Sequence, residues 1–279
     1  MRRAGPGWCT RLNDQITNCG PSLGGFMSFG SFDVATNGRV PLTQDVTLLG
    51  GLMAGTASRN GVATPLSTGA ALALRYDPAG MGSARPFAEI GAAGSVKRMR
   101  LERRYDTGTG VASGTGEADG YDLVAYARVG WVSSLGKRDE VAVSASLTGM
   151  WQGVAAYEEA QSPDNPFPAL VPESTDRLGI AALNVHYTHL FPEILGLPVE
   201  LGLNGGVQHM FAQKSGVVAE IADLSFAPDR PKITYVQLGG RISMRVSRLL
   251  SAGVFVNATL APDRIGSAVH GGFGFRTLF

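Results

Sequence analysis

The feature that most constrains this chain is an alternation of apolar and polar residues with a period of two. In residues 236–246, for example, Leu238 and Ile242 fall on one side of the alternation, while Gln237 and Arg241 fall on the other. Successive side chains of a β-strand point to opposite faces, so this pattern predicts a strand with one apolar and one polar face. The alternation recurs along almost the whole chain, which predicts an all-β protein.

Counting each alternating stretch as one strand gives a sheet of about twelve strands. Most of them exceed the ~5–6 residues of an ordinary globular strand. Many reach the ~9–11 tilted residues that cross a bilayer. The predicted strands span residues 24–34, 45–57, 65–77, 86–99, 119–133, 139–155, 176–190, 197–212, 216–226, 233–247, 250–261 and 266–279.

Composition and residue placement favour a membrane barrel over a soluble β-sandwich. Only 17% of the residues are charged and 38 are glycine, whereas soluble domains carry ~25% charged residues. The apolar faces are rich in Ala, Gly, Val and Leu, with aromatic residues such as Tyr76, Trp131 and Trp151 near strand ends. A sandwich core would need larger side chains, while lipid needs no close packing and interfaces favour Tyr and Trp. An open edge would leave backbone groups unsatisfied in hydrocarbon, so the fold class is a closed antiparallel transmembrane β-barrel.

The charged residues within these strands lie on the less apolar face. An arginine facing lipid at midplane costs ~2–4 kcal/mol, so this face must turn to the lumen. The predicted lumen-lining residues are Arg75, Glu89, Asp122, Arg128, Glu140, Glu200, Arg241, Arg245 and Arg276.

The last predicted strand carries aromatic residues at alternate positions and ends on Phe279. Phe273, Phe275 and Phe279 share one face. This pattern resembles the signal that the barrel-assembly machinery reads in outer-membrane proteins. Capture of such a strand by β-augmentation, with aromatic anchors, gives the resemblance a physical basis.

Residues 20–279 resemble the C-terminal translocator domain of autotransporters. The resemblance rests on size, on the closing strand Gly-Phe-Gly-Phe-Arg-Thr-Leu-Phe, and on the order of three preceding blocks. These blocks lie at residues 48–52, 85–91 and 238–242. It implies a barrel over 24–279 in the outer membrane of a Gram-negative bacterium, and a linker over 1–23 that threads the lumen. The implied function is type V secretion, in which the barrel supports export and surface display of an N-terminal passenger.

The N-terminal region adds two expectations. No apolar stretch follows Arg2 and Arg3, so a secretory signal is absent, and we expect the chain to be part of a longer precursor. Cys9 and Cys19 could form a local disulfide, which would suit an oxidising compartment, and two unpaired thiols are the alternative. No Cys/His cluster has metal-ligand spacing, so neither a metal nor another cofactor is expected.

Other functions find little support in the sequence. The formal net charge of +1 gives no reason to expect a nucleic-acid partner. None of the four histidines has the His-x-Ser spacing of an outer-membrane phospholipase, and the Asp-x-His of an omptin protease does not occur, so no enzyme is expected. A stand-alone channel or porin for small solutes remains the alternative function.

A basic cluster at one predicted strand end suggests contact with outer-membrane lipid or lipopolysaccharide phosphates, although a solvated extension would look the same. Its members are Lys97, Arg98, Arg100, Arg103 and Arg104. The remaining expected partners are the assembly machinery and the protein's own passenger, around a monomeric barrel.

The sidedness of two long connections conflicts with the strand count. Residues 100–118 and 156–175 fall on the periplasmic side, where turns are normally short. Either the count is wrong by one strand in this region, or strands extend beyond the membrane.

Overall fold

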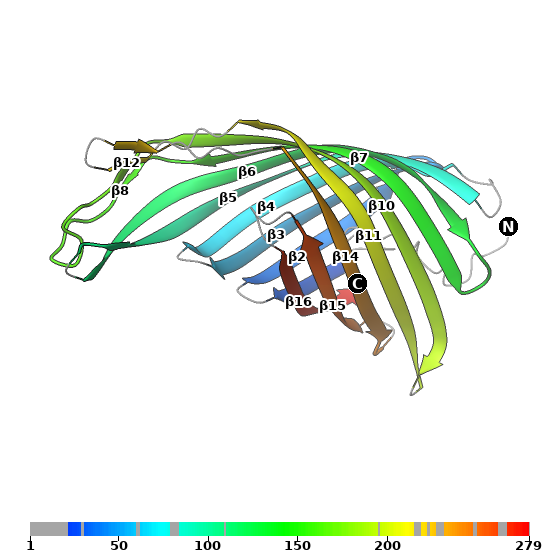
Figure 1. The fold of residues 1–279 in the computed structure, drawn as a ribbon. Helices are drawn as coiled ribbons and strands as arrows, with labels where there is room; N and C mark the ends of the chain where they lie inside the picture. Colours follow the sequence, from blue (N-terminus) through cyan, green and yellow to red (C-terminus); the bar gives the residue numbers. More distant parts are fainter. Residues whose placement is uncertain are drawn as a thin grey trace.

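The computed structural model describes residues 22–28, 31–59, 62–78, 84–108, 110–194, 196–214, 219–221, 224–226, 232–247, 250–261 and 267–278. Within these residues, twelve antiparallel strands close into a barrel, which confirms the predicted fold class (Figure 1). The barrel strands are β1 (Ser22–Ser28), β2 (Ser31–Pro41), β3 (Val46–Arg59), β4 (Val62–Tyr76), β5 (Ala84–Asp106), β6 (Val111–Ser134), β7 (Asp139–Val154), β10 (Ser174–Ile194), β11 (Leu197–Lys214), β14 (Ile233–Arg245), β15 (Leu250–Leu260) and β16 (Ala268–Leu278).

Closure comes from the first and last strands. β1 pairs with β2 on one side and with β16 on the other, so that Ser22 lies opposite Leu278. Every other barrel strand pairs with the barrel strand before and after it along the chain. The backbone groups therefore find partners around the ring, as hydrocarbon requires.

A second, smaller sheet lies at one end of the barrel. It contains β8 (Tyr157–Glu158), β9 (Leu170–Val171), β12 (Ala219–Ile221) and β13 (Leu224–Phe226) in the order β13-β12-β9-β8. In Figure 1 its strands lie near the left end of the molecule, beside the long β5–β6 hairpin. The two longest connections between barrel strands, β7 to β10 and β11 to β14, supply this sheet.

Connection lengths assign the two ends. The connections at the end with the small sheet include residues 155–173 and 215–232, whereas those at the other end are the shorter segments 42–45, 77–83, 135–138, 195–196 and 246–249. Outer-membrane barrels have short periplasmic turns and longer extracellular loops. The small sheet and the β5–β6 tip therefore lie at the extracellular end.

Two predicted strands were wrong, and their errors cancel in the count of twelve. The predicted strand 24–34 is two strands, β1 and β2, joined by a two-residue connection. The described residues of the predicted barrel strand 216–226 form β12 and β13, which belong to the small sheet. The extra early strand moves 100–118 and 156–175 to the extracellular end. The count was therefore wrong by one strand, but at residues 24–34 and not between 100 and 175 as expected. The strands β5 and β6 also extend, to 23 and 24 residues, as the second explanation proposed.

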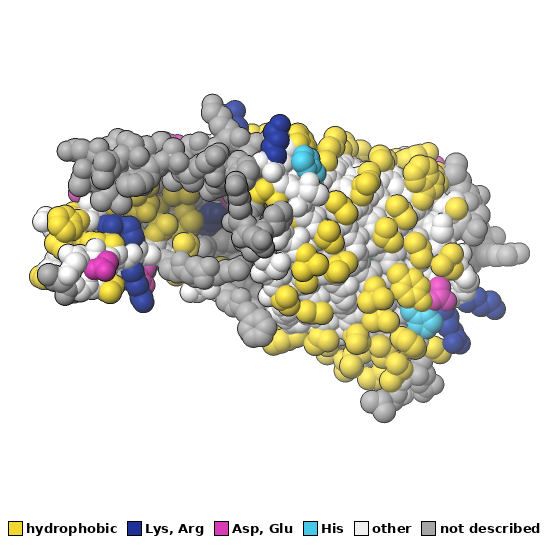
Figure 2. Space-filling view, in the orientation of Figure 1, with side chains coloured by type: hydrophobic (Ala, Val, Ile, Leu, Met, Phe, Trp, Pro, Cys, Tyr) yellow, Lys and Arg dark blue, Asp and Glu magenta, His cyan; other side chains and the backbone are white. Residues whose placement is uncertain are grey.

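The outside of the barrel is an apolar belt, visible as the largely yellow surface with charges gathered toward the ends in Figure 2. Aromatic residues mark its borders on β6, where Tyr121 and Trp131 both point outward and are exposed. Ten residues at ~3.3 Å, tilted by ~40°, separate them by about 25 Å along the barrel axis, which is the height of the apolar band of outer-membrane barrels. Among the described residues, no helix is long and apolar enough to cross a membrane.

Candidate functional site: the charged lumen

The strand register determines which side chains face the lumen. Residues directly opposite on neighbouring strands share a face, and Arg75, Glu89 and Arg128 form one such row across β4, β5 and β6. Continuing these rows around the ring puts all nine residues predicted to line the lumen on the inward face. The outward positions between them carry exposed apolar side chains such as Ile90 and Leu123.

A buried carboxylate, Glu89, is the centre of the largest charged cluster. Its Oε1 accepts hydrogen bonds from the Tyr126 hydroxyl at 2.8 Å and from Arg128 Nη2 at 2.9 Å. Its Oε2 lies 3.4 Å from Arg75 Nη1. Arg75 also binds Asp77, with 2.5 Å between Nε and Oδ2. Arg75 and Glu89 are each only 4% exposed, so the pair is removed from water and each charge depends on its partners.

Aromatic and glycine residues hold this Glu89 cluster in place. The Phe87 ring lies beneath both guanidinium groups, 4.5 Å from Arg75 Cζ and 5.6 Å from Arg128 Cζ. The Tyr126 ring crosses the backbone at Gly91, where an added Cβ would come within 2.6 Å of the ring. Glycine at position 91 therefore permits the close approach that directs the Tyr126 hydroxyl to Glu89.

A second cluster surrounds Asp122, nearer the extracellular end of β6. Lys97 Nζ lies 2.8 and 2.9 Å from its two carboxylate oxygens. Gln152 Nε2 donates to Oδ1 at 2.9 Å, and the Ser95 hydroxyl donates to Oδ2 at 3.3 Å. Asp122 thereby links the three strands β5, β6 and β7 across the lumen face.

Basic residues dominate the wall formed by β14 and β16. Arg241 Nη2 lies 2.7 Å from Glu200 Oε1, and Arg276 lies within electrostatic range of Arg241, Glu200 and Arg245. The lumen therefore has a paired, buried set of charges on β4–β7 and a predominantly cationic group on the opposite part of the ring.

Three solved structures of similar fold are translocator domains of autotransporters. The translocator domain of the autotransporter NalP from Neisseria meningitidis matches with a TM-score of 0.60 and 11% identity, over 93% of this chain and 85% of that chain. The β-domain of the Bordetella autotransporter BrkA matches with a TM-score of 0.55 and 12% identity, over 93% of this chain and 99% of that chain. The transport unit of AIDA-I from Escherichia coli matches with a TM-score of 0.52 and 14% identity, over 97% and 93% of the two chains.

This chain has the fold of an autotransporter translocator barrel. The likeness confirms the fold that the sequence resemblance implied, and with the apolar belt it supports the expected location in the outer membrane of a Gram-negative bacterium. No protein-family model matches the chain, and no curated protein matches its sequence.

Several lumen residues of this translocator fold escaped the sequence prediction. Arg85, whose Nη2 lies 3.6 Å from Glu140 Oε2, and Lys97 both face inward. Tyr126 does so as well. The alternation could have identified them, because each is separated by an even number of residues from a predicted lumen residue on the same strand.

The residues predicted to form the assembly signal and the disulfide are only partly covered by the structure. Phe273 and Phe275 point outward from β16 and are exposed. Phe279, Cys9 and Cys19 lie outside the described residues, so the full assembly signal and the disulfide stay predictions.

The described histidines gather at no common centre. His189 Nδ1 lies 2.7 Å from Asp139 Oδ1 at the periplasmic rim, while His209 Nδ1 lies 2.8 Å from the Thr234 hydroxyl near the other end. Within the described ranges, no group of three or more His, Cys, Asp or Glu could hold a metal ion.

The predicted basic cluster is divided between the two faces. Lys97 binds Asp122 in the lumen. Of the outward members, Arg98 Nε lies 3.4 Å from Asp119 and Arg104 Nε lies 2.8 Å from Glu102. The inward Arg103 belongs to a different structure at the extracellular end.

That structure, which we call the arm, comprises residues 99–118 of the β5–β6 hairpin and residues 155–173 packed against them. Arg103 forms two hydrogen bonds with Glu159, Nε to Oε1 at 2.9 Å and Nη2 to Oε2 at 2.7 Å. Glu159 is 4% exposed and Asn165 is 1% exposed. Asn165 accepts a hydrogen bond from the Tyr105 hydroxyl at 2.7 Å. A satisfied buried network of this kind fixes the connection on the hairpin.

Acid is expected to loosen the arm. Burial raises the pKa of Glu159, but hydrogen bonds from Arg103, the Ala169 N–H and Asn165 outweigh it and hold the pKa below its ordinary value of 4.5. A carboxyl whose pKa is lower in the folded state stabilises that state above its unfolded pKa, and the contribution is lost as pH falls through the folded pKa. Hydrogen exchange at the Ala169 amide, which donates to Glu159 at 3.0 Å, should therefore lose protection as the pH is lowered from 5 to 3.

The matched control is the Glu159→Gln variant, in which protection at Ala169 should already be weak at neutral pH and should change little with acid. Amides in the middle of β6 serve as the internal reference. Unchanged Ala169 protection between pH 7 and pH 3 in the unmodified protein would contradict the role given to Glu159.

Proposed function

We propose that this barrel is an outer-membrane translocator and anchor, which supports export and surface display of a passenger attached at its N-terminal side. The observation that carries the proposal is the translocator fold itself, matched along 93–97% of the chain with TM-scores of 0.52–0.60. The assembly machinery and the passenger are the partners that this function requires.

The width of the barrel suits this function. Twelve strands spaced by ~4.8 Å and tilted by ~40° give a backbone diameter of about 24 Å. Inward side chains reduce this to a passage of about the ~10–12 Å diameter of one helix. Such a lumen can hold a single threaded segment, whereas porins of 16–18 strands keep a wide aqueous channel.

The position of β1 fits the same function. Ser22 lies opposite Leu278 at the end with the short turns, so the preceding residues join the barrel at its periplasmic end. A passenger on the N-terminal side that is displayed outside must then be connected to β1 through the lumen. The charged clusters of the lumen provide polar partners for that connecting segment.

Surface display tests the translocator function. A signal peptide and a reporter domain placed before residue 1 should yield a reporter that added protease removes from intact cells. The control carries the same signal peptide and reporter on residues 22–279, where the loss of the connecting segment should leave the reporter inside. A reporter that stays periplasmic with the full chain, while the barrel itself assembles, would overturn the proposal.

Conductance tests the threaded segment. Deleting residues 1–21 is expected to raise the single-channel conductance of the purified barrel in planar bilayers, because the lumen loses its occupant. Equal conductance of the full and shortened chains would contradict a threaded segment. Full conductance of the undeleted chain, together with failure of display, would favour the channel for small solutes.

A further inference from the structure

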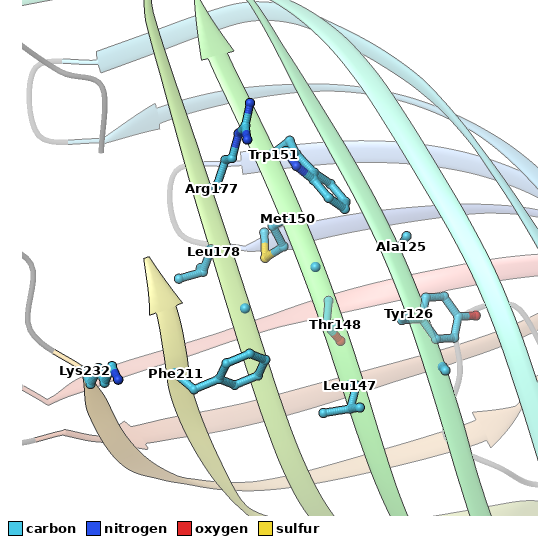
Figure 3. Close-up of a pocket in the computed structure, with 13 residues that line it drawn as sticks. Ala125, Tyr126, Leu147, Thr148, Met150, Trp151, Arg177, Leu178, Phe211 and Lys232 are labelled. Carbon is cyan, nitrogen blue, oxygen red and sulfur yellow. The ribbon is translucent and has the colours of Figure 1, made fainter. Parts of the chain in front are cut away.

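An apolar groove of about 870 Å³ lies on the outer face of the barrel and reaches from the middle of the apolar belt toward its extracellular border (Figure 3). Three rows of outward residues on β6, β7 and β10 form it. The middle row, Ala125, Gly149 and Gly179, has almost no side chains. The row on the periplasmic side contains Leu147, and the row on the extracellular side contains Trp151. The groove is therefore a trough between two rows of larger side chains.

The β11 side of the groove is closed by an irregularity in the sheet. The register of β10 with β11 shifts between Gly179 and Ile180. Phe211 lies at that shift and lines the groove (Figure 3). The trough is thus bounded by aromatic rings at two sides and is open to the membrane.

Two cations lie at the rim of this trough. Arg177 is directly opposite Trp151 across the β7–β10 ladder, and Lys232 immediately precedes β14 at the extracellular end. Both line the groove. Trp151 and Tyr121 belong to the aromatic border of the apolar belt, so Arg177 lies at the depth of the outer-leaflet head groups, where a lipid-facing cation is tolerated.

Arg177 and Lys232 differ in their surroundings from two other outward cations, Arg98 and Arg104. Among the described residues, neither forms an ion pair, whereas the outward Arg98 and Arg104 bind Asp119 and Glu102. An arginine and a lysine that form no ion pair within the described part of the chain, above an apolar trough, complement a ligand with phosphate at its head and acyl chains below.

We propose that this groove binds the phosphorylated acyl glycolipid of the outer leaflet, the lipid A part of lipopolysaccharide. Its phosphate binds Arg177 and Lys232, and an acyl chain lies over the exposed Ala125 between Leu147 and the Trp151 ring, which itself covers Gly149. The lipid contact predicted for the basic cluster at Lys97–Arg104 thereby moves to β7, β10 and β14. Glycolipid bound at this height would fix the depth of the barrel independently of what passes through its lumen.

Native mass spectrometry of the purified full chain, titrated with lipid A, tests the proposal. The double variant Arg177→Ala/Lys232→Ala is expected to bind lipid A at least ten-fold more weakly. The matched control, Arg98→Ala/Arg104→Ala, removes two outward cations that do not line the groove and should bind as the parent does. Equal affinity of the Arg177→Ala/Lys232→Ala variant and the parent would overturn the proposal.

Heat-modifiable gel mobility checks that the Arg177→Ala/Lys232→Ala variant is folded. Two further comparisons test the proposal without that variant. Dephosphorylated lipid A should bind the unmodified barrel at least ten-fold more weakly, and Ala125→Leu, which fills the exposed part of the trough and leaves both cations, should also weaken binding. Equal binding of dephosphorylated lipid A, or of phosphatidylglycerol, to the unmodified barrel would overturn the assignment to lipid A.

Discussion

Replacing Ile90 with arginine is expected to destabilise the folded barrel by about 2–4 kcal/mol in lipid vesicles, the cost of a lipid-facing cation near the midplane. Ile90 is 59% exposed on the outward face of β5, opposite Ala127 on β6. Ala127 lies between the aromatic borders at Tyr121 and Trp131. In water such an exposed position would tolerate arginine, but in hydrocarbon the cation has no partner.

Urea unfolding of the vesicle-inserted barrel, followed by tryptophan fluorescence, measures this loss. Val111→Arg is the matched control, because Val111 is 78% exposed at the outer tip of the β5–β6 hairpin, beyond the apolar belt. It should change the unfolding free energy by less than about 0.5 kcal/mol, as ordinary surface substitutions do. Equal effects of the two substitutions would contradict a membrane-spanning position for β5.

The sequence predicted the barrel and the facing of its residues because lipid imposes period two on every spanning strand. It failed where that constraint ends. β5 and β6 continue far past the predicted ends at residues 99 and 119, because in the arm neither face meets lipid and small and charged residues replace the apolar alternation. Residues 216–226 are apolar enough to resemble a spanning strand, yet they form two three-residue strands of the small sheet.

The missed turn between β1 and β2 has a different cause. A connection of only two residues, 29–30, leaves little room for turn-forming residues, and the alternation passes through it almost unbroken. Because β1 and β2 were counted as one strand, every connection up to residue 216 was assigned to the wrong side of the membrane. The assignment of each residue to the lumen or to lipid was unaffected, since it depends only on alternation within a single strand.

Alternation within a strand shows which residues face the lumen, but not which of them contact one another. It placed Arg75, Glu89 and Arg128 on the lumen face, but these residues come from three strands. Which of them meet depends on register, and register depends on closure of the whole ring. The close approach of Tyr126 to Gly91 cannot be predicted from the sequence for the same reason.

Removing the charge of Glu89 is expected to have the largest effect inside the barrel. Glu89→Gln preserves shape but removes the negative charge that Arg128 and Arg75 share, in a site where Glu89 and Arg75 are each 4% exposed. Breaking a buried ion pair by removing one partner costs about 3–5 kcal/mol. Because Arg75 keeps Asp77 at 2.5 Å, we expect a loss near the lower end, measured by urea unfolding in vesicles.

A double variant separates charge from packing in this prediction. Glu89→Gln/Arg128→Met removes both members of one pair, and it should recover part of the stability lost in Glu89→Gln, because the guanidinium that lost its contact with Glu89 is then removed as well. Glu102→Gln, in the exposed pair with Arg104, should cost no more than about 1 kcal/mol. If Glu89→Gln were as mild as Glu102→Gln, the Glu89 cluster would be hydrated, and water would screen the ion pairs of β4, β5 and β6.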